Sequence, residues 1–201
     1  HKGNITGSLG DFTLPGLTVY AGSTTVIVDQ AKINWSPAMF FIGKLTISQL
    51  RVENVTVKVD TSKFDDDDTP TTFDFPFDLH ANSIIIKKAL VQVDDIYLYY
   101  KNLNAAAGLY KNMLSVKNLK GLAFDQTLNF HFPIASLNLN SPFHVTANAT
   151  YHYNNAPLRT GKTSGKLLGD FGGAFTFDTS GTAILNDKPY QYHVASTIDH
   201  R

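Results

Sequence analysis

Apolar and polar residues alternate one by one over most of this chain. The pattern holds over residues 31–35, 44–48, 55–59, 128–132 and 143–153. Successive side chains of a β-strand point to opposite faces, so this period of two is typical of strands with one apolar face. The sequence therefore predicts an all-β protein built from amphipathic strands.

The composition favours the same fold class. The chain has one Glu (Glu53) and 16 Asp, with 20 Thr and 15 Asn. Glu, a good helix former, is thus nearly absent, while residues that favour strands and turns are abundant. Two short helices are expected. One lies between Ser36 and Gly43, where Pro37 suits a first helical position, and the other covers Asn104–Lys111.

A repeat and one polar segment organise the chain. The pattern Leu50-x-Val52-x-x-Val55-x-Val57 returns 34 residues later as Ile84-x-Ile86-x-x-Ala89-x-Val91, and a weaker copy begins at Leu114. An ordinary antiparallel meander and an array of stacked strand units both produce such a repeat. An Asp- and Pro-rich loop at 63–75 separates a first strand unit, 1–62, from a second, 76–201, and the two are expected to form one continuous sheet.

No motif for catalysis or metal binding is present. The formal net charge of zero argues against a nucleic-acid partner, and the absence of Cys excludes disulfides and thiolate ligands. The seven His include no close pair at helical spacing, and the run Asp65–Asp68 lacks the Gly and Glu of a calcium loop. We therefore expect a protein that is not an enzyme and has no metal and no cofactor.

An apolar sheet face must be covered, yet the chain offers almost no helix to cover it. Such a sheet closes on itself as a barrel or sandwich, or it curls around an apolar ligand. Each buried methylene is worth about 0.8 kcal/mol, so shielding a sixteen-carbon acyl chain is worth roughly 12 kcal/mol. A binding surface of this kind needs no catalytic residue.

The first part of the chain resembles the TamB family, which is related to the AsmA and chorein types. The resemblance rests on an ordered set of short motifs: Ile5-Thr6-Gly7-Ser8-Leu9, Leu14-x-x-Leu17-x-Val19, Ala31-x-Ile33-x-Trp35-x-Pro37 and Gly43-x-Leu45-x-Ile47-x-x-Leu50. It is sharpest over residues 1–100, and the rest of the chain is compatible with it.

This resemblance implies an elongated, curled, antiparallel or mixed sheet with an apolar inner face, a trough called a β-taco. It also implies a location in the bacterial periplasm, an inner-membrane anchor preceding the present N-terminus, the outer-membrane barrel partner TamA, and transport of phospholipid between the two membranes. The residues expected to line the trough are Ile33, Trp35, Leu45, Ile47, Leu50, Val52, Val55, Val57, Ile84, Ile86, Val91 and Val93.

Two other functions fit the same pattern. One is a chaperone or assembly factor for outer-membrane and autotransporter proteins, which uses exposed sheet edges to template strands. The other is a secreted β-sandwich with a dry core and a sugar platform of Tyr97, Tyr99 and Tyr100. In the TamB-like reading, the apolar turn Pro37, Met39, Phe40 and Phe41 either lies near the membrane or caps the end of the core.

Overall fold

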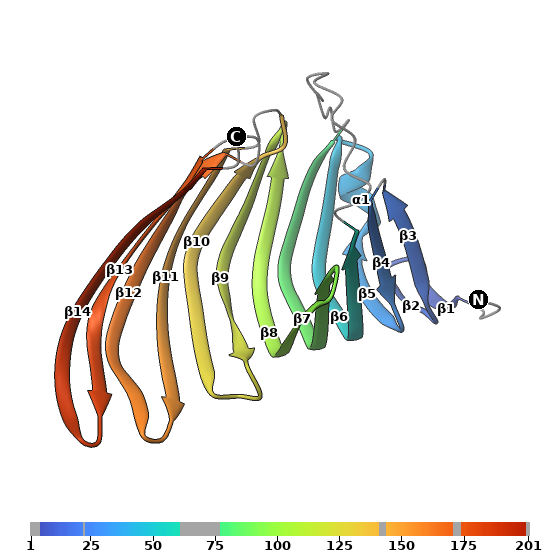
Figure 1. Ribbon diagram of the computed structural model, residues 1–201. Helices are drawn as coiled ribbons and strands as arrows, with labels where there is room; N and C mark the ends of the chain where they lie inside the picture. The colour runs from blue at the N-terminus through green and yellow to red at the C-terminus, as the bar shows by residue number, and fades with distance from the viewer. Residues whose placement is uncertain (1–4, 22, 61–76, 141–143, 171–173, 200–201) are drawn as a thin grey trace.

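The fold is one large curled sheet. The computed structural model describes residues 5–21, 23–60, 77–140, 144–170 and 174–199, and these form a 14-stranded mixed sheet with one four-residue helix (Figure 1). The predicted all-β class and curled sheet are confirmed. The loop predicted at 63–75 lies outside the described residues.

The elements follow one another along the sheet. In chain order they are β1 (Thr6–Ser8), β2 (Asp11–Leu14), β3 (Leu17–Ala21), β4 (Thr24–Val28), β5 (Ala31–Ser36), α1 (Pro37–Phe40), β6 (Lys44–Val59), β7 (Asp78–Val93), β8 (Ile96–Tyr110), β9 (Met113–Ala123), β10 (Leu128–Asn138), β11 (His144–Asn155), β12 (Leu158–Asp170), β13 (Ala174–Leu185) and β14 (Lys188–Asp199). The main path runs β1-β2-β5-β6 and then in chain order to β14, while β4 pairs with both β3 and β6.

The 34-residue repeat is the register of a parallel strand pair. β6 and β7 run parallel, and Leu50 lies opposite Ile84, Val52 opposite Ile86, with the same offset along both strands. The two copies of the repeat are therefore side by side, and their apolar residues share one face. From β7 to β14 each strand pairs antiparallel with the next, as in a meander.

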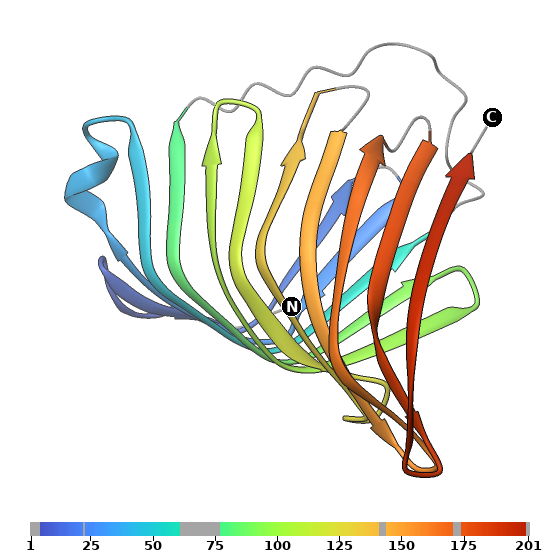
Figure 2. The ribbon, with the colours of Figure 1, turned by 90° about the vertical axis from the view of Figure 1, so that its left-hand side faces the viewer.

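The strands bend near their middles, and this bending makes the sheet a trough (Figure 2). β-Bulges interrupt the ladders of β8, β10, β11 and β12, with register shifts that begin at Lys101, His131, Tyr151 and Thr160. A bulge bends its strand and increases the local twist. In β8 the bulge includes Asn102 at φ 52°, a left-handed conformation that Asn tolerates better than most residues.

One of the two predicted helices is wrong. α1 forms where Pro37 was expected to start it, but residues 104–110 belong to strand β8, and Lys111 lies in the turn that follows. Alanine favours helix, yet Ala107 pairs with Ala81 on one side and with Val116 on the other. Pairing with two neighbouring strands outweighs the intrinsic propensity.

The buried residues lie on one face of the sheet, which we call the concave face. They include Val52, Ala81, Leu109, Ala123 and Ala147, and register relates them across neighbouring strands. Among the described residues, no side chain is completely buried. The chain exposes 13147 Å², whereas a compact monomer of its mass exposes roughly 9,300 Å². Apolar side chains thus line the concave face of a single sheet, and no second sheet packs over them among the described residues. This excludes the closed sandwich.

Candidate functional site: an apolar groove on the concave face

The predicted lining residues share the concave face. Each is buried or half-buried, and register groups them in rows across the strands. Val57, for example, lies between Val26 and Val91, and Leu50 lies between Ile33 and Ile84. That these residues contact lipid stays a prediction.

Trp35 contacts both the segment between β1 and β2 and helix α1. Its indole Nε1 donates a hydrogen bond to the Leu9 carbonyl oxygen at 2.6 Å, and its ring meets that of Phe40 edge-on at a centroid distance of 6.5 Å. Phe40 in turn packs edge-on against Phe77 at 5.8 Å. Trp35 therefore has a structural role at this end of the sheet in addition to its place on the concave face.

The turn after Trp35 divides into a packed part and an exposed part. Pro37 and Met39 are half-buried, and Phe40 packs in the aromatic cluster, whereas Phe41 is 88% exposed. Ile42 is exposed as well. The exposed residues of this turn are therefore available for a membrane contact, and its packed residues are available for capping the end of the core.

Replacing Phe41 and Ile42 with Ser tests the membrane role. Full burial of each such side chain is worth about 1.5–3 kcal/mol, so loss of both is expected to weaken liposome co-sedimentation more than tenfold. Folding stability is expected to stay unchanged, because neither side chain packs in the sheet. Unchanged co-sedimentation would show that the turn does not contact the membrane and only caps the end of the core.

The groove itself lies further along the sheet than the predicted residues. It has a volume of about 370 Å³ and spans β8 to β13 on the concave face. Its lining is mostly apolar and consists of alanine, leucine and aromatic side chains: Tyr100, Ala123, Leu128, Phe130, Phe132, Ala147, Ala149, Tyr151, Leu167 and Phe177. Gly165 and Lys166 of β12 and Phe124 of the β9–β10 turn also border it.

Aromatic rings form one wall of this groove. The Phe130 ring lies edge-on to Tyr100 at 5.9 Å and to Phe132 at 5.8 Å. Opposite them, Ala149 pairs with Gly165, so small residues leave the space that the rings border. Burial raises the pKa of the Tyr100 hydroxyl above its ordinary value, as expected for a phenol facing an apolar surface.

Sequence reasoning missed the groove residues, although their pattern was visible. The alternation of Phe130 with Phe132 and of Ala147, Ala149 and Tyr151 marked strands, but nothing in it showed that these strands bend around a common space. The predicted sugar platform is also wrong, because its three tyrosines do not share one face of the sheet. Tyr97 and Tyr99 are exposed on the convex face, whereas Tyr100 lies on the concave face.

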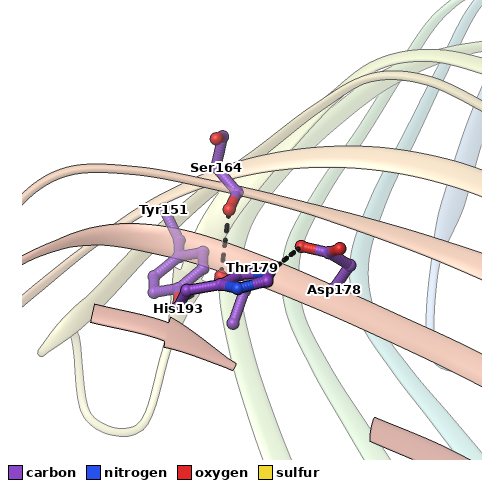
Figure 3. A network of polar contacts seen from close by, with 5 residues as sticks. All are labelled: Tyr151, Ser164, Asp178, Thr179 and His193. Carbon is purple, nitrogen blue, oxygen red and sulfur yellow. Dashed lines mark hydrogen bonds and ion pairs between the residues drawn. The ribbon is translucent and has the colours of Figure 1, made fainter. Parts of the chain in front are cut away.

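The convex face is mostly polar apart from exposed side chains such as Tyr97 and Tyr99, and polar side chains on it pair between neighbouring strands. Lys87 Nζ lies 2.7 Å from Glu53 on the adjacent strand, and His144 Nδ1 lies 2.7 Å from Asp170. On the last two strands, His193 Nε2 of β14 lies 3.1 Å from Asp178 of β13 (Figure 3). Because these pairs are solvent-exposed, each contributes little to the free energy of unfolding.

Two kinds of site are not found in the described part of the chain. No three His, Asp or Glu residues there approach one another closely enough to hold a metal ion. No helix among those residues is long and apolar enough to cross a bilayer.

A curled single sheet with an open, apolar concave face and a polar convex face defines a class of trough-shaped β-proteins. The model of one family, described as the TamB N-terminal domain, matches residues 1–171 of this chain. The chain belongs to the TamB family, which confirms the resemblance. No curated protein and no solved structure matches it.

Proposed function

We propose that this chain is a periplasmic segment of an inner-membrane-anchored TamB-family protein, and that its trough carries phospholipid acyl chains between the two membranes of a bacterial envelope. The observation that supports this most is the open apolar groove on a concave face with no completely buried side chain among the described residues. A polar convex face beside it suits an aqueous compartment.

The energetics favour such a conduit. An acyl chain of sixteen carbons that leaves a membrane unshielded exposes surface worth roughly 12 kcal/mol, and contact with an apolar face removes much of this cost. Because the groove is open along one side, a lipid acyl chain enters it from that side and is bound without a closed pocket. This role uses burial alone, so we propose a non-catalytic protein without a cofactor.

Native mass spectrometry of the domain purified from bacterial membranes tests this proposal. We expect a population with phospholipid bound at near-stoichiometric amounts, identified after lipid extraction. The matched control is the same protein after delipidation and incubation with vesicles, which should regain the bound mass. A lipid-free mass in both preparations would contradict the proposal.

A second function has its own supporting observation. β14 pairs with β13 along its length and, among the described residues, with no other strand, so it is an edge strand of this sheet. Tyr190, Val194 and Ile198 of this edge are exposed. Such an edge accepts an added strand, as an assembly factor working with the outer-membrane partner TamA requires.

Strand addition is tested by titrating an outer-membrane β-signal peptide onto the domain. The assembly function predicts saturable binding that Val194→Pro abolishes, because proline at the edge removes a backbone donor. Equal binding by the Val194→Pro variant, or no binding by the native sequence, would count against that function.

A further inference from the structure

Four hydroxyl groups meet on the concave face at one end of the groove. The Tyr151 hydroxyl oxygen lies 2.8 Å from Thr179 Oγ1 and 2.8 Å from the Tyr192 hydroxyl oxygen. The Tyr192 hydroxyl donates to Thr163 Oγ1 at 3.1 Å. Thr179 Oγ1 donates to the Ser164 carbonyl oxygen at 2.9 Å (Figure 3). We call Tyr151, Thr163, Thr179 and Tyr192 the hydroxyl cluster.

Register and a missing side chain bring the cluster together. Tyr151 pairs with Thr163, Thr163 with Gly181, and Gly181 with Tyr192, so these positions form one row across β11 to β14. Thr179 lies two residues before Gly181 in β13, on the same face. Gly181 has no side chain, so the Tyr192 side chain reaches across β13 to Tyr151. Thr179 and Tyr192 lie beyond the segment that the family model matches.

The cluster adjoins the groove and is largely withdrawn from water. Thr163 is 2% exposed and Thr179 is 4% exposed. Tyr151 belongs to both features, because its ring lines the groove while its hydroxyl belongs to the cluster. Burial also raises the pKa of the Tyr151 hydroxyl, so the phenol stays protonated at neutral pH.

A count of protons shows what the cluster is able to bind. Its four contacts, three between hydroxyls and one to a carbonyl oxygen, need one proton each. Tyr192 donates to Thr163 Oγ1 and Thr179 donates to the Ser164 carbonyl oxygen, so the single Tyr151 proton faces two acceptors and one contact lacks a donor. The one proton outside these contacts belongs to Thr163, which is 2% exposed and so is shielded from a ligand in the groove. The capacity that remains consists of oxygen lone pairs, and a bound polar group must therefore bring its own hydrogen-bond donors.

We propose that the hydroxyl cluster holds the donor-bearing polar end of a lipid, a hydroxyl or ammonium group, while the acyl chain lies in the adjoining groove. This inference rests on the proposed lipid-carrying function and adds a chemical preference to it. An ethanolamine headgroup has three N–H donors, whereas a choline headgroup has none. Two lipids with identical acyl chains therefore differ at this site alone.

The test compares phosphatidylethanolamine with phosphatidylcholine, both diacyl lipids of the same short chain length so that neither carries a glycerol hydroxyl, titrated onto the whole domain. We expect about tenfold tighter binding of the ethanolamine lipid, and we expect the Tyr151→Phe, Tyr192→Phe double variant to reduce that ratio to near one. Choline-lipid affinity should not change in the double variant, which also reports that the groove is intact. Tyr190→Phe, on the same face of β14, is the matched control and should keep the tenfold ratio.

The outcomes separate this inference from the function on which it rests. Equal binding of both lipids by the native sequence, or a preference that survives in the double variant, overturns the role of the hydroxyl cluster and leaves the trough in place. Failure of the native sequence to bind either lipid overturns both.

Discussion

Ala149→Trp is expected to reduce phospholipid binding at least tenfold while the sheet stays folded. Ala149 lines the groove, and its partner on β12 is Gly165, so an indole at this position fills the space that an acyl chain would use. Overpacking a sealed core costs about 1–3 kcal/mol, but here the added ring has an open side into which it extends. Titration with a fluorescent acyl-chain lipid measures the effect.

Asn148→Trp is the control for bulk without occlusion. Asn148 is exposed on the convex face, next to Ala149 in the same strand. The control variant should bind lipid as the native protein does. Equal affinities of all three proteins would show that acyl chains do not occupy this groove.

Val57→Asp is expected to abolish bound lipid and to leave an elongated sheet. Val57 lies in a valine row between Val26 and Val91 on the concave face. A carboxylate stays hydrated while the trough is open to water, but a lipid chain passing over it would remove that water at a cost of several kcal/mol. Native mass spectrometry measures the bound lipid, and small-angle X-ray scattering measures the shape.

Thr56→Asp places the same charge on the convex face, since Thr56 is the neighbour of Val57 in β6. This variant should retain lipid. If Val57→Asp unfolds the protein while Thr56→Asp does not, the concave face is a packed core rather than an open trough.

The strands and their apolar face were predictable because a period of two is a local signal. The parallel pairing of β6 and β7 was present in the 34-residue repeat, since a constant offset is what parallel register produces. The helix expected at 104–111 does not form. Its alanines favour helix, but Ala107 pairs with a strand on each side, and this pairing determines the structure. That information is not local.

The position of the groove was not predictable for the same reason. It depends on where bulges bend β8 to β12, and a bulge changes the alternation by only one residue. The hydroxyl cluster is still less visible, because Tyr151 and Tyr192 are separated by 41 residues and meet only through the register of β11 to β14. Sequence alternation predicts which face a residue takes, whereas the curvature of the sheet determines which residues share a site.

Two adjacent tyrosines allow the central claim to be tested directly. Tyr100 lies on the concave face in the wall of the groove, and Tyr99 is exposed on the convex face of the same strand. A photoreactive benzophenone amino acid placed at each position in turn reports which face meets lipid in living cells. Crosslinking to phospholipid from position 100 and not from position 99 is the predicted result. Equal crosslinking from both positions, or crosslinking from position 99 alone, would contradict an apolar trough that carries lipid.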